Sequence, residues 1–490
     1  MALLTIIYAL IGANAAQSLF RDSDAGWHIR VGERLLSTGQ LPTSDPFSFT
    51  RAGAPWVTWE WLADALMGFA HQTAGLPGVA WLYLMLLGLC TWLWIRWTWT
   101  LGGSFLLAAA FLAPMLSTAN LHWLARPHVF SWCLALAGLW LLDRLETQPR
   151  PSHLALAAAF GCLWANLHAS FGLGAVILGI YALAAWLEKT LLAQRQLPLQ
   201  AGSYAALFVA FTAGTLVNPH GWSLHAHVAS YLANSALLDR IGEFQSFNFH
   251  VDGATQVLLT VLLGAVAALG ALAQGRLAHG LLCGVLLAGA LRSARGLPLL
   301  ALLALPVANA VLSRASLHLF QPRLRRAIEG FRQYSANLRT LERNSHGAAW
   351  VLPLMLATAG ILLALGRNGK VGFPPDQFPV AAAAHVPSGA RVLAPDKFGG
   401  YLIYRFNGQL PVYFDGRSDF YGLDFMKRYI SLVEVRPGWT AELDRHHFTH
   451  ALLPANYSLI SALGARGWQK LHADSTATLL AAPEVLNGPQ

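Results

Sequence analysis

The chain has 490 residues, of which 55% are hydrophobic and only 12% are charged, and it carries a formal net charge of +9. Soluble domains usually contain about 25% charged residues, so this composition excludes an ordinary soluble enzyme and indicates a protein that crosses a membrane many times. Much of the positive charge lies in residues 314–346, which hold seven Arg and two Glu. Beside membrane segments such a cluster marks the cytoplasmic side and favours anionic lipid as a partner over nucleic acid.

Apolar runs long enough to span a bilayer, about 20 residues each, recur from residue 1 to residue 366. We expect eleven transmembrane helices, near 2–20, 77–97, 104–121, 128–143, 153–167, 172–187, 201–217, 254–273, 277–291, 297–313 and 348–366. The positive-inside rule then places the N-terminus and the basic loop 314–347 in the cytoplasm. An odd number of crossings leaves residues 369–490 outside the cytoplasm, as a soluble domain after a transmembrane domain of residues 1–368. The expected aromatic belt at the cytoplasmic boundary is formed by Trp92, Trp94, Trp97 and Trp99.

The first external loop, residues 21–60, places acidic side chains directly after an apolar segment. Charged residues near membrane depth are costly and often mark a functional site. We interpret Asp24 as a general base at the membrane surface, with Asp22 as the second candidate and His28 as a further catalytic residue. The alternative for Asp24 is a helix cap, because Asp is a favoured N-cap residue and a helix can follow it.

Other external turns also hold polar residues, which the predicted topology brings to one face of the membrane. The substrate-binding candidates in these turns are Arg126, His128, His168, His220, Glu243, Arg292 and Arg295. Guanidinium groups offer forked donors to phosphate oxygens, so the arginines as a set predict a phosphate or pyrophosphate site. For each single Arg the alternative is a contact with a lipid headgroup, or an ion pair with Asp22, Asp24 or Glu243.

The sequence shows no recognisable metal-binding pattern. Its 18 His residues include no HExxH spacing, and its four Cys lie in apolar segments without a CxxC pair. We therefore predict no metal site and no certain cofactor, with a divalent ion held by Asp and His side chains as the alternative.

Residues 369–490 alternate short β-type runs with amphipathic stretches, which predicts a small α/β domain. The expected strands are 391–395 (RVLAP), 399–406 (GGYLIYRF), 410–419 (LPVYFDGRSD), 450–455 and 476–483, and the expected helices are 421–434 and 437–447. Asp415 and Arg417 end the third run, where α/β sheets often bind ligands, so we include both among the substrate-binding residues. The alternative is a turn at Asp415, with Arg417 paired to a neighbouring acid.

Six short motifs, taken in order, resemble a bacterial branch of the GT-C superfamily, the polytopic glycosyltransferases that use polyprenyl-phosphate-linked sugars. The motifs are Asp24–His28 (DAGWH), Asp45–Ser48 (DPFS), Ala125–His128 (ARPH), Asn166–Ser170 (NLHAS), Asn218–Gly221 (NPHG) and Gly399–Arg417, which runs from GGYLIY to DGR. The likeness spans nearly the whole chain, and the order of the motifs is its specific part. GT-C enzymes commonly carry adjacent acids in the first loop, whereas here Ser23 separates Asp22 from Asp24.

The resemblance implies a mainly α-helical protein of the bacterial inner membrane with an extracytoplasmic α/β domain. It implies transfer of a sugar, with inversion, from a polyprenyl-phosphate donor to a hydroxyl of an envelope glycan, lipid or protein. In that reaction Asp24 deprotonates the acceptor, while Arg126, Arg292 or Arg295 stabilises the departing lipid phosphate. Two other interpretations remain: a transporter or flippase of lipid-linked glycans, and a noncatalytic scaffold with the same fold.

Overall fold

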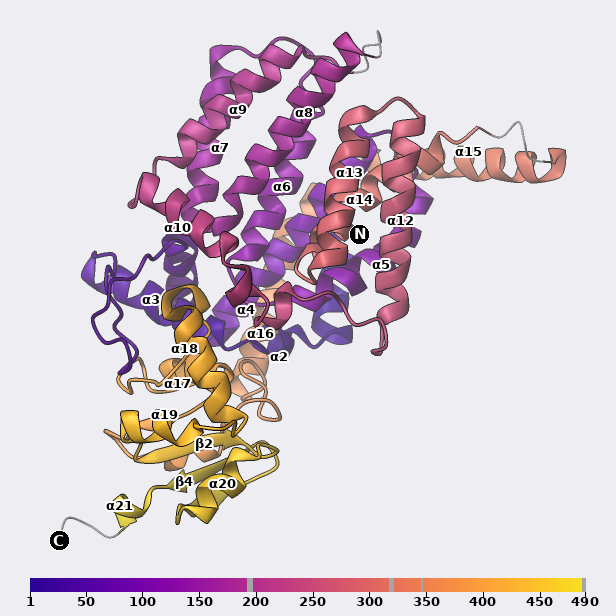
Figure 1. Ribbon diagram of the computed structural model, residues 1–490. Coiled ribbons are helices and arrows are strands. Elements are labelled where there is room, and N and C mark those ends of the chain that lie inside the picture. The colour runs from indigo at the N-terminus through magenta and orange to yellow at the C-terminus, as the bar shows by residue number, and fades with distance from the viewer. Residues whose placement is uncertain (192–196, 317–320, 345–346, 487–490) are drawn as a thin grey trace.

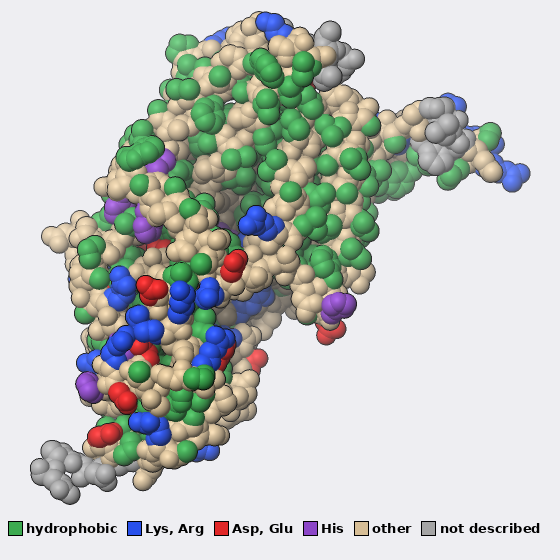
Figure 2. Space-filling view, in the orientation of Figure 1, with side chains coloured by type: hydrophobic (Ala, Val, Ile, Leu, Met, Phe, Trp, Pro, Cys, Tyr) green, Lys and Arg blue, Asp and Glu red, His purple; other side chains and the backbone are tan. Residues whose placement is uncertain are grey.

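The computed structural model describes residues 1–191, 197–316, 321–344 and 347–486, and consists of a tall helical bundle with a small α/β domain at one end (Figure 1). Figure 2 shows hydrophobic side chains over the flank of the bundle and charged side chains gathered over the smaller domain. Within the described residues, five helical segments are long and apolar enough to cross a membrane: Trp61–Thr100, Phe105–His122, Ala169–Thr190, Ala254–Ala273 and Gly296–Ser313. These are features of a membrane protein.

After the first predicted segment, each expected segment corresponds to a helix, although the first of these helices begins well before residue 77 and is kinked at Ala74 and Gly75. They are α4 (Trp61–Thr100), α5 (Phe105–Ala119), α6 (His128–Leu142), α7 (Pro151–Leu167), α8 (Gly172–Thr190), α9 (Ala201–Thr215), α12 (Ala254–Ala273), α13 (Leu277–Arg292), α14 (Gly296–Ser313) and α16 (Val351–Arg367). The segment expected at 2–20 is broken instead: α1 (Ala2–Ile7) continues as a π-helical turn, and Asn14 then takes a φ of +46° before α2 (Ala15–Ser18). The expected number of eleven crossings stays a prediction, because several of these helices are short.

Helix α15 (Pro322–Asn344) carries the basic segment and projects sideways from the bundle in Figure 1. It is attached through Ser335, whose hydroxyl lies 2.8 Å from that of Ser104 at the start of α5. The predicted aromatic belt stays a prediction, although its four Trp residues differ in exposure. Trp94 and Trp97 are fully buried, because α4 packs against α6 and α14, whereas Trp92 is exposed at the bundle surface.

The C-terminal domain contains a four-stranded sheet in the order β1-β2-β4-β3. Its strands are β1 (Val392–Leu393), β2 (His450–Pro454), β3 (Gln469–Ala473) and β4 (Ala477–Ala481), and its helices are α17 (Asp396–Arg405), α18 (Ser418–Val433), α19 (Trp439–His446), α20 (Leu459–Ala465) and α21 (Pro483–Leu486). Strands β1 and β2 are parallel, and the other pairs are antiparallel.

The expected strand at 399–406 is wrong, because this run folds as α17. The run is rich in β-forming residues, but Phe398, Tyr401 and Leu402 lie at helical spacing and are all buried. Tertiary packing therefore overrides local propensity here. Residues 410–419 are not a regular strand either, although Val412 forms isolated bridges to Ser48 and Val392.

Residues 21–60, the predicted first external loop, pack directly against this domain. This segment contains α3 (Asp24–Thr38), which crosses α17 so closely that a Cβ added at Gly26 would overlap the carbonyl oxygen of Gly400. Farther along the loop, the Thr50 hydroxyl donates to the carbonyl of Tyr413 at 2.8 Å. A single hydrophobic core joins the loop, the bundle and the domain, so the two predicted parts of the chain meet over a packed interface.

Candidate active site

A cavity of about 730 Å³ lies where the bundle meets the C-terminal domain. Its wall comes from the start of α3, the start of α4, the turn before α6, the 241–244 turn and the loops before α17 and α18. The predicted site residues in this wall are Asp22, Asp24, Arg126, His128, His168, Glu243, Arg295 and Arg417. Long-range packing thus brings together turns that the predicted topology had placed on one face.

Asp24 is the first residue of α3, and its carboxyl group faces the cavity although the residue is only 5% exposed. Its side chain does not cap the helix; instead its backbone N–H donates to Oδ1 of Asp22 at 2.9 Å. Burial raises the pKa of Asp24 to about 7, with Asp22 adding to the rise and Arg126 opposing it. A carboxyl group with such a pKa can exchange a proton near neutral pH.

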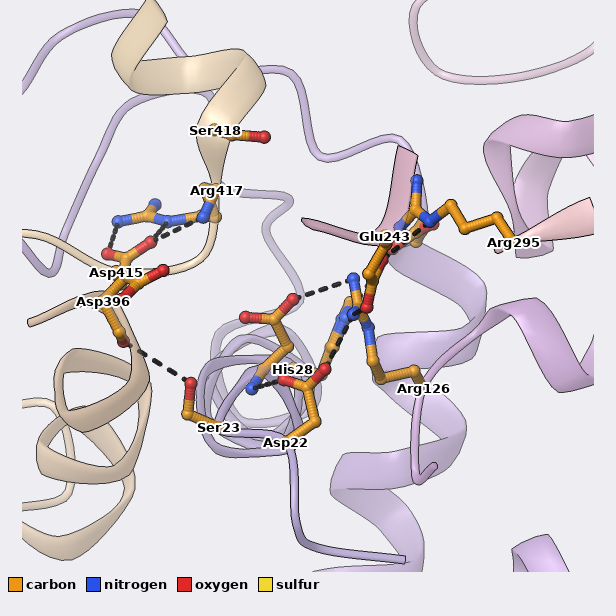
Figure 3. Close-up of polar contacts among 12 residues, drawn as sticks. Asp22, Ser23, His28, Arg126, Glu243, Arg295, Asp396, Asp415, Arg417 and Ser418 are labelled. Carbon is orange, nitrogen blue, oxygen red and sulfur yellow. Dashed lines mark hydrogen bonds and ion pairs between the residues drawn. The ribbon is translucent and has the colours of Figure 1, made fainter. Parts of the chain in front are cut away.

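Arg126 binds three carboxylates at once. Its guanidinium lies 2.8 Å from Asp22, 2.9 Å from Asp24 and 3.2 Å from Glu243. Figure 3 shows Arg126 beside Asp22 and Glu243, with Arg295 on Glu243 as well. The ion pair from Arg295 Nε to Glu243 measures 2.7 Å. Arg126 therefore orients the acidic groups, as the ion-pair alternative for this residue had predicted.

Glu243 is ionised between these two arginines. Burial by itself would raise the pKa of Glu243, but Arg126 and Arg295 outweigh burial and hold that pKa well below its usual value. Arg295 contacts Glu243 through Nε, and its side chain remains 38% exposed in the cavity wall. Of these two arginines, Arg295 is thus the one with N–H groups available to an incoming anion.

A second acid–base pair lines the cavity at the start of α4. The Glu60 carboxyl group lies 3.3 Å from Nε2 of His168, and burial raises the pKa of Glu60 to about 8. Burial lowers the pKa of His168 to about 3, and the positive charges of Arg295 and Arg126 add to this effect. Glu60 is therefore a protonated donor at neutral pH, which its position in the first loop alone did not reveal.

Arg417 is a buried ion-pair centre. Its Nε and Nη2 bind the Asp415 carboxylate at 2.8 and 2.7 Å, and Nη2 also binds Asp45 at 2.9 Å. The guanidinium stacks over Trp56 at 4.6 Å, so this group ties the first loop to the C-terminal domain. Gly416, which lies between Asp415 and Arg417 in the sequence, leaves room for Asp24, since a Cβ at Gly416 would overlap the Asp24 carboxyl group.

Four predicted site residues lie outside the cavity wall: His28, His220, Arg292 and Asp415. His28 is fully buried one turn beyond Asp24, and its Nδ1 lies 2.6 Å from Asp64, so it faces α4. Arg292 is exposed at the end of α13, and Asp415 is enclosed by its partner Arg417. The structure thus places these four residues outside the cavity wall, and their roles in the site stay predictions. Sequence order alone does not show which face of a helix or turn is buried.

Sequence reasoning missed part of the site that the C-terminal domain supplies. Asp396, Lys397 and Gln377 line the cavity, and the carbonyl of Asp396 accepts from the Ser23 hydroxyl at 3.5 Å. The signal was the charged Asp396–Lys397 pair directly before the GGYLIY motif. Helix α10 (Trp222–Ala233) closes another side, where the Tyr231 hydroxyl lies 3.0 Å from that of Ser418.

In the part of the chain that the structure describes, no group of three or more His, Cys, Asp or Glu residues is arranged to hold a metal ion. The acidic residues nearest Asp24 are instead bound to the guanidinium of Arg126.

Comparison with known proteins finds similarity at the level of structure. No protein-family model matches the chain, and no curated sequence matches it. Among solved structures, the oligosaccharyltransferase of Archaeoglobus fulgidus in its apo form is similar, with a TM-score of 0.57 over 93% of this chain and 69% of that chain, at 11% identity. At this identity the likeness concerns the fold, and the chain has a GT-C-like fold, as its motifs had predicted.

Proposed function

We propose that this protein is a membrane glycosyltransferase that moves a sugar from a polyprenyl-phosphate-linked donor to an acceptor hydroxyl, with inversion. The observation that carries the proposal is the position of Asp24, a buried carboxyl group in the wall of a large cavity that combines charged and apolar side chains at the end of an apolar bundle. The likeness of fold to an oligosaccharyltransferase supports glycosyl transfer as the class of reaction.

In the proposed step, the Asp24 carboxylate takes the proton of the acceptor hydroxyl. The acceptor oxygen forms a bond to the anomeric carbon as the bond from that carbon to the lipid phosphate breaks, and the phosphate leaves with the bonding electrons. Arg126 holds Asp24 at 2.9 Å, which fixes the direction in which the base faces.

The departing lipid phosphate is proposed to bind Arg295, whose exposed guanidinium is the better placed of the two arginines on Glu243. Leu299 of α14 and Val228 and Leu232 of α10 add apolar surface to the same cavity, which suits the first part of a lipid chain. A soluble donor would make little use of a cavity set into apolar helices.

The acceptor is proposed to lie beside Trp59, the partly exposed indole among the four Trp side chains that line the cavity, which presents an apolar face next to polar groups. Such faces can stack on sugar rings, so an envelope glycan or glycolipid suits this surface, and a protein acceptor is the alternative. We place the reaction on the extracytoplasmic face of the bacterial inner membrane, because the basic loop marks the other side.

Replacing Asp24 by Asn tests the proposal. We expect Asp24→Asn to lower transfer by at least about 100-fold, because general-base catalysis typically contributes that much. The measurement is mass spectrometry of envelope glycolipids and polymers from a strain lacking the protein, complemented by wild type, by Asp24→Asn or by Asp239→Asn at matched expression. Asp239 is an exposed acid outside the cavity wall and serves as the control.

A glycan that is lost in the deletion strain and returns with wild type and Asp239→Asn, but not with Asp24→Asn, supports the transferase and its base together. Full restoration by Asp24→Asn contradicts the proposed role of Asp24 and turns attention to the scaffold interpretation. Accumulation of an intact lipid-linked glycan on the cytoplasmic face of the membrane in the deletion strain favours the flippase interpretation.

A further inference from the structure

A group of aromatic and polar side chains forms a part of the cavity wall that the proposed proton transfer does not use. Three segments that are far apart in the sequence supply it. The end of the first loop contributes Trp59, α10 contributes His227 and Tyr231, and the start of α18 contributes Ser418 and Asp419. We refer to these five residues as the Trp59 cluster; all of them except His227 line the cavity.

The indole of Trp59 is held in place by two rings of α10. Its ring centroid lies 4.9 Å from that of His227 and 5.9 Å from that of Tyr231, and both pairs meet edge to face. Trp59 is partly exposed, whereas the other three Trp side chains of the cavity wall are buried. A partly exposed indole in a fixed position offers an apolar surface on which the C–H face of a sugar ring can pack.

Asp419 brings a carboxylate to the same place. Its Oδ2 lies 3.1 Å from Nε2 of His227, and its side chain is only 9% exposed. A carboxylate has two oxygens and about four acceptor positions, so the contact with His227 uses only part of its capacity. Neighbouring hydroxyls of one sugar ring are suitable donors for the rest, because hydrogen bonds to a charged acceptor are the strong ones.

Two hydroxyl groups complete the cluster. The Tyr231 hydroxyl lies 3.0 Å from that of Ser418, and either can be the donor. A hydroxyl can donate and accept at once, as each hydroxyl of a sugar does. The five residues include neither Lys nor Arg. This chemistry therefore suits an uncharged ligand with several hydroxyls and does not suit a phosphate.

The Trp59 cluster is set apart from the arginine that is proposed to bind the lipid phosphate. The Tyr231 ring centroid lies 6.2 Å from that of Phe244, and the Arg295 guanidinium carbon lies 4.6 Å from the Phe244 ring centroid. Tyr231 and Phe244 thus follow each other in the row of contacts from Trp59 to Arg295. A sugar on Trp59 is at the far end of this row from the leaving phosphate.

The cluster is close to the proposed base. Gly416 lies against the Asp24 carboxyl group, and Asp419 follows Gly416 by three residues. Three residues of chain separate their Cα atoms by at most about 11 Å. A sugar bound to Asp419 is therefore near Asp24, which is the position of an acceptor.

We infer that the Trp59 cluster binds an uncharged sugar ring of the acceptor, so that the acceptor is a glycan or a glycolipid and not a protein side chain. The assignment to the acceptor rests on the proposed function, whereas sugar binding by itself does not.

The test measures binding of methyl glycosides to the full chain by saturation-transfer difference NMR, in a detergent without a sugar headgroup. The probes are the methyl glycosides of glucose, galactose, mannose and N-acetylglucosamine, and we expect at least one to bind the wild type. Asp419→Asn is expected to weaken that binding at least about tenfold, because a hydrogen bond to a charged group contributes that much. Trp59→Leu is expected to weaken it about fivefold through lost stacking.

Matched variants control for folding and for general charge effects. Trp59→Phe keeps an aromatic ring and is expected to keep most of the binding, with the thermal midpoint of each variant showing that it is folded. Asp424→Asn removes an acid of the same helix whose side chain is 89% exposed outside the cavity wall. Trp222→Leu removes an exposed indole of α10, also outside the wall. Both are expected to bind like wild type.

Three results would overturn the inference. The first is the absence of saturation transfer to all four glycosides by the folded wild type. The second is equal loss of binding in Asp419→Asn and Asp424→Asn. The third is binding of a serine-containing peptide that Asp419→Asn and Trp59→Leu abolish, because the cluster would then hold a protein acceptor.

Undecaprenyl phosphate in excess separates the acceptor site from the donor site. It is expected to leave the glycoside bound, since its phosphate is proposed to bind Arg295. Displacement of the glycoside would assign the cluster to the donor and overturn the inference.

The complementation experiment distinguishes this inference from the proposed function. If Asp419→Asn binds glycosides like wild type while Asp24→Asn abolishes the envelope product, the sugar site is wrong and the transferase stands. If Asp24→Asn restores the product while Asp419→Asn loses glycoside binding, the sugar site stands and the proposed base is wrong.

Discussion

Asp24 shares the Arg126 guanidinium with two other carboxylates, so its proton affinity is set by neighbours that can be changed one at a time. Asp22 raises the pKa of Asp24, whereas Arg126 lowers it. Asp22 also forms an ion pair with Arg126 at 2.8 Å, which partly neutralises the charge that Arg126 presents to Asp24. Removing the charge of Asp22 therefore lowers the pKa of Asp24 in two ways. It takes away a repelling carboxylate, and it lets Arg126 interact more strongly with Asp24.

If Asp24 is the base, kcat/KM rises with pH as its carboxyl group loses a proton, with a midpoint near pH 7 in the wild type. We expect Asp22→Asn to move this midpoint to lower pH, because the pKa of Asp24 falls. The measurement is the pH profile of kcat/KM for both proteins, with Asp239→Asn as the control that keeps the wild-type profile. A midpoint that stays in place or moves upward contradicts the assignment of Asp24 as the titrating group.

At the scale of elements, the crossing of α3 and α17 determines where the acidic groups stand. Gly26 and Gly400 allow the two backbones to approach closely, and a Cβ added at Gly400 would meet Ser23. The Arg30 guanidinium then donates to the carbonyl of Tyr404 at 2.8 Å. Asp24 begins α3, and Gly416 of the C-terminal domain lies against its carboxyl group. A shift of the C-terminal domain therefore changes the surroundings of Asp24 in the cavity.

We expect Gly26→Ala to destabilise the protein by about 1–3 kcal/mol, the usual cost of overpacking a tight contact. The thermal midpoint in detergent reports the loss, and limited proteolysis reports release of the C-terminal domain. Gly284→Ala is the control, since an added Cβ there meets nothing within 4 Å and a helical Ala is at least as stable as Gly. Equal midpoints for the two variants would mean that the crossing adapts without cost.

At the scale of the whole molecule, the two ends of the bundle differ in chemistry. The candidate active-site cavity combines acids with arginines at one end, while Arg96, Arg144 and the basic helix α15 lie at the other. This asymmetry is the pattern that the positive-inside rule relates to orientation. It supports the expected topology, in which the C-terminal domain and the basic helix lie on opposite sides of the membrane.

Cysteine labelling tests this topology in a background where the four native cysteines are replaced by Ala. We expect Arg466→Cys, in the C-terminal domain, to react with a membrane-impermeant maleimide on intact spheroplasts, because an odd number of crossings places it outside. Arg326→Cys, on α15, is expected to react only after permeabilisation. Both positions are exposed, so labelling after permeabilisation serves as the control. Labelling of both in intact spheroplasts would indicate an even number of crossings between them.

The candidate site was predictable from the sequence only as a set of residues on one face. The sequence identified the members of this set, which are Asp22, Asp24, Arg126, Glu243 and Arg295. It did not show that the Arg126 guanidinium binds all three carboxylates. The ion pair from Arg126 to Asp22 joins residues 104 positions apart, a distance over which neither spacing nor propensity carries information.

By itself, the sequence determined that the chain is a helical membrane protein, because hydrophobic length and the asymmetry of basic residues act locally between each segment and the bilayer. It also determined the order of motifs from which the GT-C-like fold was predicted. Only the tertiary structure decided that GGYLIYRF is a helix, that His28 faces Asp64 and that Glu60 faces the cavity. Each of these depends on which surfaces pack together, and packing is a property of contacts between distant segments.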